Sequence, residues 1–181
     1  MKYRFEVKLS EQDYVDFNVF HMLRSEYGKK QIKNLRILLA VFIVIINLLT
    51  FAGEDFSADS LFFIIPMVIV LIVFEIFLPK FLKWSLKGTI KGLKKSGKMG
   101  YSPESVIEFY EDCFIEATPQ KKIEQKYETL ENIYIVDMKM IYLYENNVAA
   151  YMLPTACFKS KVELDEFIEF LKTKCSKIKV Y

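Results

Sequence analysis

The chain has 181 residues, 52% of them hydrophobic, and a formal net charge of +2, which suits one modest domain with a membrane hairpin and argues against two independent cores. Its charge is segregated, because residues 24–98 hold twelve basic and five acidic residues whereas residues 101–181 hold ten basic and fourteen acidic residues. A nucleic-acid surface needs basic residues to offset phosphate charge, so the acidic C-terminal part argues against nucleic acid as a partner.

Residues 1–34 are expected to form a cytoplasmic strand followed by an amphipathic helix. Residues 3–9 alternate between apolar and charged side chains, which is typical of a half-buried strand. Ser10 with Asp13 resembles a capping box and predicts that a helix begins there. We expect Gly28 to end or bend this helix before the next segment.

Two long apolar segments, residues 35–53 and 60–78, follow. Each is about as long as the ~20 residues that an α-helix needs to cross a ~30 Å hydrocarbon core, so residues 35–79 predict a transmembrane hairpin. The acidic connection at residues 53–60 contains no Lys or Arg, whereas basic residues flank both outer ends of the hairpin. The positive-inside rule therefore places both termini in the cytoplasm.

Glu75 is the only acidic residue inside either segment, and an intramembrane carboxylate is a functional candidate because its burial is costly. It lies about one helical turn before Lys80, near the cytoplasmic interface, where it can instead reach that interface or pair with Arg36. Both interpretations of Glu75 stay open on the sequence. Asn47 and Pro66 are expected to give a helix–helix hydrogen bond and a kink.

Residues 80–100 predict a basic juxtamembrane helix that continues the second span. Its lysines recur every three or four residues and so share one face, and Trp84 lies just past Pro79, where an indole suits the membrane interface. This face can bind anionic lipid headgroups at ~1 kcal/mol per lysine, dock an acidic protein, or serve only as a topology signal. The lysines concerned are Lys80, Lys83, Lys87, Lys91, Lys94 and Lys98, and a second stripe holds Leu82, Leu86, Ile90 and Leu93.

The remainder, residues 101–181, has the rhythm of short strands separated by polar turns. Asn146 and Asn147 can supply the positive φ angles that a tight hairpin needs. A helix over residues 161–174, opened by a capping box of Ser160 with Glu163, closes this domain. The expected strands are residues 106–110, 113–117, 121–127, 132–138, 140–144 and 148–153.

The histidine and the three cysteines of the chain lie in no catalytic or metal-binding pattern. His21 has neither a second His nor a Cys nearby, which favours a packing or surface role. Cys113, Cys157 and Cys175 lack any C-x-x-C spacing and are expected to be reduced, apolar thiols. We expect no cofactor, no metal and no enzymatic activity, because the sequence offers no nucleophile with a base and no phosphate-binding loop.

Several stretches of the chain resemble the YcxB-like family of small bacterial membrane proteins. They are EQDYVDFN at residues 11–18 with His21, the two apolar spans, and the tail motifs YLY, YMLP and CF at residues 142–144, 151–154 and 157–158. The resemblance implies a bacterial inner-membrane location. For residues 101–181 it implies a pleckstrin-homology-like (PH-like) domain, in which a strongly bent antiparallel sheet is closed by a C-terminal helix. Many relatives have a Trp where this chain has Tyr127.

The sequence thus predicts a membrane α+β protein: a two-helix transmembrane hairpin with a cytoplasmic PH-like antiparallel β domain closed by a C-terminal helix. We expect it to bind or regulate a cytoplasmic partner protein, or to self-associate, without catalysis. The alternative is a small accessory subunit of a membrane transport or export complex that acts through the spans and Glu75. The strand at residues 3–9 needs a partner to bury its apolar face, so we predict that it and the helix after Ser10 pack against the C-terminal sheet.

Overall fold

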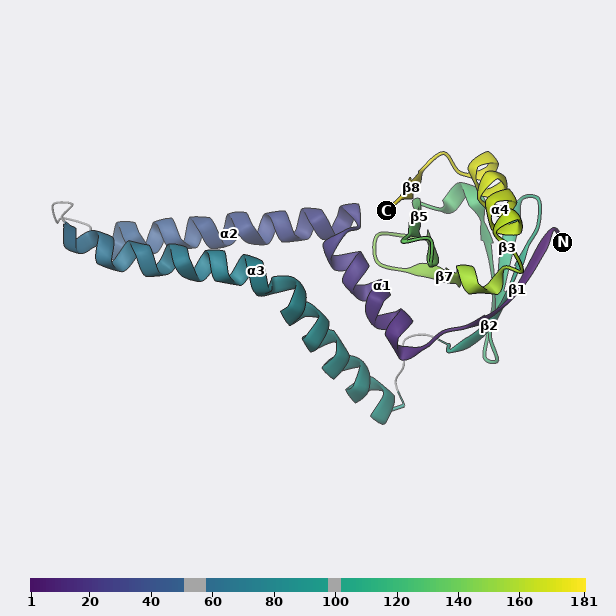
Figure 1. The fold of residues 1–181 in the computed structure, drawn as a ribbon, viewed down its shortest axis with the longest axis horizontal. Coiled ribbons are helices and arrows are strands. Elements are labelled where there is room, and N and C mark those ends of the chain that lie inside the picture. Colours follow the sequence, from purple (N-terminus) through teal and green to yellow (C-terminus); the bar gives the residue numbers. More distant parts are fainter. Residues whose placement is uncertain (51–57, 98–101) are drawn as a thin grey trace. The chain divides into compact units, whose positions relative to one another are not determined.

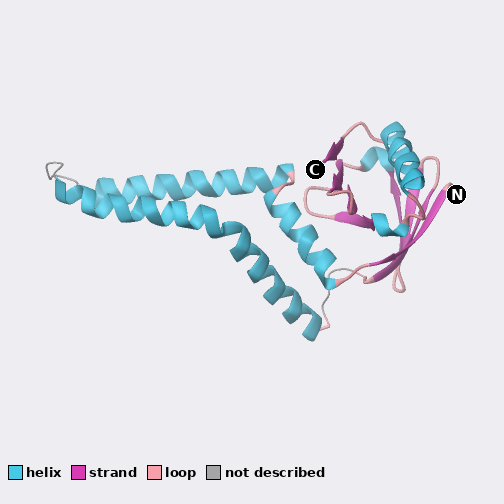
Figure 2. Ribbon diagram, in the orientation of Figure 1, coloured by secondary structure: helices cyan, strands magenta, loops and turns pink. Residues whose placement is uncertain are grey.

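A computed structural model describes residues 1–50, 58–97 and 102–181 (Figure 1), and the chain divides into two compact units. The sheet unit comprises Met1–Glu11 and Met99–Tyr181, and the helical unit comprises Gln12–Lys98. Figure 2 shows that the strands gather in the first of these, whereas the second consists of long helices. The expected basic residue Lys98 and the acidic pair Glu54 and Asp55 lie outside the described residues.

The first sheet of the sheet unit is built from both ends of the chain. Its strands are β1 (Tyr3–Lys8), β2 (Glu104–Phe109), β3 (Cys113–Ala117) and β4 (Lys122–Lys126), in the order β1-β2-β3-β4. All neighbours are antiparallel, and β1 pairs with β2 along its whole length. The prediction that the N-terminal strand joins the C-terminal sheet is therefore confirmed. That the following helix also packs on this domain stays a prediction.

The second sheet contains β5 (Asn132–Val136), β6 (Met140–Tyr144), β7 (Ala150–Pro154) and β8 (Ile178–Val180) in the order β7-β6-β5-β8. Strand β8 is parallel to β5, whereas the other pairs are antiparallel. Strand β8 was not predicted, because three residues are too short to show a strand period. A tertiary contact holds it: Tyr181 N donates to Ile135 O over 2.8 Å.

Helix α4 (Lys161–Lys174) closes the core of the sheet unit. Its capping box is present, since Glu163 N donates to Ser160 Oγ over 3.2 Å and Lys159 N donates to Glu163 Oε2 over 2.7 Å. The core consists of aromatic and branched side chains from both sheets and from α4. Phe167 of α4 lies at its centre, with ring contacts to Tyr3, Phe5, Phe109, Phe158 and Phe170.

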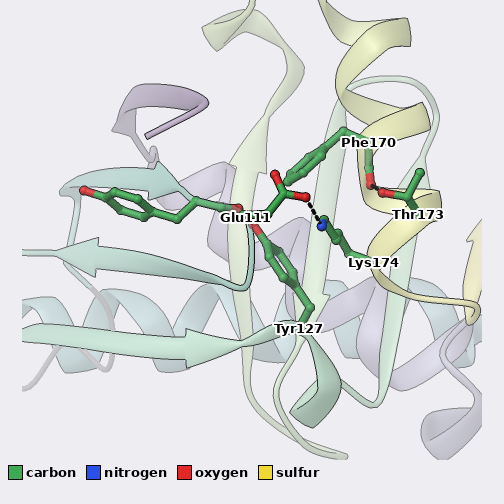
Figure 3. Close-up of polar contacts among 6 residues, drawn as sticks. Glu111, Tyr127, Phe170, Thr173 and Lys174 are labelled. Carbon is green, nitrogen blue, oxygen red and sulfur yellow. Dashed lines mark hydrogen bonds and ion pairs between the residues drawn. The ribbon is translucent and has the colours of Figure 1, made fainter.

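The C-terminal end of α4 is fixed to the β2–β3 turn by an ion pair (Figure 3). Lys174 Nζ donates to Glu111 Oε1, and the same ammonium lies 5.6 Å from the centre of the Phe170 ring. Tyr127 lies beneath them and donates from its hydroxyl to Tyr110 O over 3.0 Å. Burial raises the pKa of Tyr127, so this hydroxyl stays a donor. These contacts hold the closing helix over the sheets.

The turn between β5 and β6 is tighter than the sequence suggested. Asp137 and Met138 have φ angles of 49° and 50°, and Lys139 N donates to Val136 O over 2.9 Å, so the turn has two central residues. The strand expected over residues 132–138 therefore ends at Val136. Among the described residues these two are the non-glycine residues with positive φ, so the expectation that the Asn146 and Asn147 turn uses positive φ is wrong.

Asn146 acts through its side chain instead. Its Oδ1 accepts hydrogen bonds from Val148 N over 3.0 Å and from Ala149 N over 2.9 Å. An Asn side chain that caps its own turn in this way replaces backbone acceptors, so no left-handed residue is needed. The following strand consequently begins at Ala150, two residues later than expected.

The helical unit contains α1 (Glu11–Leu23), α2 (Glu26–Thr50) and α3 (Ala58–Lys95). The first two helices meet at Ser25, whose hydroxyl donates to His21 O and accepts from Gly28 N over 3.0 Å. Gly28 lies inside α2 and ends no helix, whereas the bend that was its alternative prediction is present beside it, at Ser25. Residue 28 is glycine because a Cβ here would lie 2.1 Å from His21 O at the corner between the helices.

Helix α3 is continuous from the second apolar segment into the basic one, as predicted, and Figure 1 shows that it bends about midway. It contains two prolines, Pro66 and Pro79, of which Pro79 lies nearer the middle of the helix by residue number. Proline removes one backbone hydrogen bond and clashes with the carbonyl four residues earlier, which for Pro79 is that of Glu75. The bend therefore fits Pro79 better than the predicted kink at Pro66.

Candidate functional site

Helices α2 and α3 expose most of their large apolar side chains. Both α2 and α3 contain stretches that are long and apolar enough to cross a membrane, Glu26–Leu49 and Ile64–Leu93. Large side chains along them are open to the surroundings: Leu49 is 74% exposed and Phe62 is 79% exposed. At about 25 cal/mol per Å² of apolar surface, contact of such helices with water is costly. These helices are therefore candidates to span a membrane.

Arg36 and Glu75 join α2 to α3 by a bidentate ion pair. Arg36 Nε donates to Glu75 Oε1 over 2.7 Å, and Nη2 donates to Oε2 over 2.5 Å. Two parallel bonds of this kind are the strongest geometry for an arginine with a carboxylate. Pairing with Arg36 was one of two alternatives for Glu75 on the sequence. The geometry favours this structural role over a proton or ion pathway.

A second polar contact links the same helices further into the apolar region. Asn47 Nδ2 donates to Ile43 O over 2.7 Å within α2 and lies 3.6 Å from Met67 Sδ of α3. Sulfur is a weak acceptor, so the predicted helix–helix hydrogen bond is present in a weak form. Together with the Arg36–Glu75 pair it sets the antiparallel pairing of α2 with α3.

The predicted lysine face lies on the outside of α3. The helix continues to Lys95, so residues at three- or four-residue spacing lie on one side of it. Four lysine side chains of this set are described and all are exposed, whereas the second stripe is buried or half-buried; for Lys94 only the backbone is described. The exposed lysines are Lys80, Lys83, Lys87 and Lys91, and the second stripe is Leu82, Leu86, Ile90 and Leu93.

Aromatic side chains accompany these lysines. Trp84 is 74% exposed and Phe81 is 55% exposed, and their ring centres are 6.2 Å apart. Lys80 Nζ lies 5.7 Å from the centre of the Phe77 ring. The sequence analysis singled out Trp84 but missed both phenylalanines, although the spacing of 77, 81 and 84 places all three on one side of a helix. We call Lys80, Phe81, Lys83, Trp84, Lys87 and Lys91 the basic-aromatic surface.

One lysine of this surface also braces the helical unit. Lys83 Nζ lies 3.4 Å from Asp16 Oδ1, which connects α3 with α1. Both side chains are about half exposed, and such pairs contribute ~0 to 1 kcal/mol. The contact therefore orients Lys83 more than it stabilises the unit.

The remaining candidates of the sequence analysis show packing and no reactive geometry. His21 stacks between Phe17, at 6.0 Å, and Tyr27, at 5.8 Å, and burial lowers its pKa. A neutral, stacked imidazole fits the predicted packing role. The three cysteines are half-buried free thiols. Over residues 1–50, 58–97 and 102–181, no three His, Cys, Asp or Glu side chains are grouped to hold a metal ion.

In the sheet unit, β4 forms an edge of the first sheet. Thr118 N donates to Lys121 O over 2.8 Å, and hydrogen-bonded and non-bonded residue pairs alternate from this point along an antiparallel ladder. The backbone groups of Lys122, Glu124 and Lys126 therefore point away from β3. Within the described part of the chain, β4 pairs with β3 alone. This edge can accept an added strand.

Comparisons of this chain with family models, with curated proteins and with solved structures give no match. The YcxB-like family and the PH-like domain consequently stay predictions. What the structure provides is a pair of long apolar helices with a basic-aromatic surface at one end of α3, and an antiparallel β domain closed by a C-terminal helix.

Proposed function

We propose that this chain is a multi-pass protein of the bacterial inner membrane, with both termini in the cytoplasm, which presents a PH-like domain to a cytoplasmic partner protein. It acts by binding or regulation and not by catalysis. One observation carries the membrane part: the large apolar side chains of α2 and α3 point outward, while their charged ends carry Arg36, Glu75 and the lysine face. Such helices are stable in lipid, because acyl chains cover the apolar side chains and the backbone groups are paired within each helix.

The assignment of a PH-like domain in a YcxB-like protein is supported by the closing position of α4. Two mainly antiparallel sheets enclose one core, and the last helix covers it through Phe167 and its neighbours. A bent sheet closed by a C-terminal helix is what the family resemblance implies. The N-terminal strand β1 completes the first sheet, so the domain depends on sequence from both sides of the hairpin.

The binding role is supported by the free edge of β4. Outward-pointing backbone groups at Lys122, Glu124 and Lys126 can pair with an extended segment of a partner, which gives affinity without a deep pocket. A second copy of this chain can pair with this edge through the same backbone hydrogen bonds, which would give self-association. Lysines on an edge strand discourage unselective pairing, so the partner strand is expected to place acidic or small side chains opposite Lys122 and Lys126.

The alternative, an accessory subunit of a transport or export complex, places the sensitive positions in the spans. It requires Glu75 to exchange protons or ions, and the bidentate contact with Arg36 opposes this. Substitution of Glu75 together with Arg36 by a neutral pair separates the two functions. If the neutral pair at positions 36 and 75 abolishes the protein's activity in cells while the sheet unit stays folded, transport is favoured. If Glu124→Pro, which removes an outward N–H of β4, abolishes that activity instead, binding is favoured.

Cysteine labelling tests the topology. In a chain without its native cysteines, a membrane-impermeant thiol reagent added to intact cells should modify Ser57→Cys and leave Ser102→Cys and Ser176→Cys unmodified. Lysis before labelling is the control, since all three variants should then react. Labelling of Ser102→Cys in intact cells would reverse the orientation and remove the cytoplasmic partner from the proposal.

A further inference from the structure

The basic-aromatic surface combines two kinds of side chain that a water-exposed helix has no reason to combine. Trp84 is 74% exposed and lies beside Phe81, and lysines stand one turn before and one turn after it. An indole that faces water loses the benefit of burial. At the boundary between acyl chains and headgroups its apolar body and polar N–H are both satisfied.

The position of this surface along α3 fits that boundary. Trp84 follows Glu75 by nine residues, which at 1.5 Å per residue is roughly 14 Å along the helix. The Arg36–Glu75 pair marks the last charged level before the apolar body of the two helices. Beyond it the helix passes Pro79 and bends, so that the segment carrying the lysines can leave the direction of the span.

We propose that the basic-aromatic surface is a binding site for anionic phospholipid headgroups of the membrane that holds α2 and α3. The proposal rests on the membrane location proposed above. Phe81 and Trp84 enter the interfacial layer, and Lys80, Lys87 and Lys91 contact the phosphates around them. Lysine amines act as point charges toward phosphate and reach it on flexible stems. The site fixes the depth and rotation of the C-terminal part of α3.

Two other uses of these lysines explain less of the surface. A topology signal needs basic residues near the span, but it requires neither a helical spacing nor exposed aromatic rings. An acidic protein partner would account for Lys87 and Lys91, but it leaves Trp84 exposed at the end nearest the apolar body. Charge complementarity, covalent continuity with the span and the exposed rings point together to the lipid surface.

The chain contains a single tryptophan, so its tryptophan fluorescence comes from Trp84 in the proposed site. The full-length protein is placed in nanodiscs of zwitterionic lipid that contain a small, equal fraction of spin-labelled lipid with either an anionic or a zwitterionic headgroup. Each lysine near the surface raises the local anionic lipid about fivefold. We expect the labelled anionic lipid to quench Trp84 well over fivefold more strongly than the labelled zwitterionic lipid, because several lysines contribute, and Lys87→Gln to lower that ratio by about fivefold while the other lysines keep it above one.

Lys161→Gln is the matched control, because it removes the same charge from an exposed lysine at the start of α4. It should leave the quenching ratio unchanged. Equal quenching of Trp84 by the two labelled lipids would overturn the proposal and leave these lysines as a topology signal or as the docking site of an acidic protein. An equal effect of Lys161→Gln and Lys87→Gln would overturn it as well, because net charge would then explain the selectivity.

A second variant tests the membrane location separately from the lipid-binding site. The variant Trp84→Phe/Phe42→Trp moves the fluorophore into the exposed apolar part of α2, and a spin label at the end of the acyl chain should quench it strongly. Strong quenching there without headgroup selectivity at Trp84 would refute the lipid site alone. Absence of deep quenching would refute the membrane location and the lipid site together.

Discussion

The two units of this protein use apolar side chains in opposite ways. In the sheet unit the largest ones, such as Phe109, Phe114 and Phe167, are fully buried around one core. In the helical unit, Leu38, Phe42 and Val70 lie on the outside of the helices. The first pattern is that of a domain with its own packed core, and the second is the pattern that the proposed membrane location requires.

Strand β1 does not follow the division of the chain into two units: it precedes the helical unit in sequence but belongs to the sheet unit. The largest predicted effect therefore concerns β1. Truncation after Gly100 should abolish the protection of the Phe5, Val7 and Leu9 amides, because these amides donate to the segment at residues 103–107 that is removed: Leu9 N donates to Pro103 O over 2.8 Å, and bonded pairs alternate from there along the ladder. Hydrogen exchange of the full and truncated chains in nanodiscs measures this. Fast exchange of these amides in the full chain would show that β1 does not join the sheet in solution.

Two phenylalanine substitutions test the difference between inside and outside. Phe167→Ala should lower the free energy of unfolding of the sheet unit by about 3 to 5 kcal/mol, because it opens a cavity in a packed core. Phe42→Ala, on the exposed side of α2, should change the stability by less than ~0.5 kcal/mol. Chemical denaturation in detergent, followed by near-ultraviolet circular dichroism, compares them. Similar losses for both would contradict the assignment of the two environments.

The Arg36–Glu75 pair is the charged exception in the helical unit. Arg36→Ala should destabilise the pairing of α2 with α3 by about 2 kcal/mol, since it leaves a carboxylate without its partner near the apolar region. The double reversal Arg36→Glu/Glu75→Arg should restore most of this loss. Lys33→Ala, which also removes an exposed basic residue of α2, serves as the control. A double reversal no better than the single change would show that the pair is not the source of stability.

The smallest expected effects concern two carboxylates of the sheet unit with opposite pKa shifts. The hydrogen bond from Lys174 lowers the pKa of Glu111 below 4.5, so the stability it contributes is present above pH 4.5 and is lost as pH falls through the lower value. Burial raises the pKa of Glu116 above 4.5, so its charged form opposes folding increasingly as pH rises past 4.5. Glu111→Gln should therefore destabilise, and Glu116→Gln stabilise, the protein at neutral pH.

Thermal unfolding between pH 3 and pH 8 measures both differences, the pH limits being set about the ordinary carboxyl pKa of ~4. Both differences should shrink toward the acidic end, as the carboxyls become protonated. The same sign for the two variants at neutral pH would contradict the opposite environments of Glu111 and Glu116.

The sequence was informative where one local period dominates. Alternation in residues 3–9 predicted β1, the Ser160–Glu163 box predicted the start of α4, and the apolar runs predicted the long helices. Each of these signals needs only neighbours along the chain. Pairing of Glu75 with Arg36 was among the alternatives that the sequence left open, because both residues were expected at the same depth of one hairpin.

The features that the sequence did not predict depend on distant parts of the chain. Strand β8 exists because β5 offers it an edge, and the ion pair of Glu111 with Lys174 joins a turn to a helix end far along the chain. The reason for glycine at position 28 was not predicted, because the close approach of His21 O at a corner cannot be seen in a local pattern. Tertiary contacts decide each of these cases, so no local rule could have found them.

Spin-label accessibility along α2 tests the central claim, that the exposed apolar side chains of the helical unit lie in lipid. Labels are placed one at a time at Leu38, Phe42, Ile45 and Leu49, all exposed in the structure, with Lys161 on α4 as the aqueous reference. In liposomes we predict high accessibility to oxygen and low accessibility to a polar nickel complex at all four α2 positions, and the reverse at Lys161. Nickel accessibility at the α2 positions equal to that at Lys161 would contradict a membrane location for these helices.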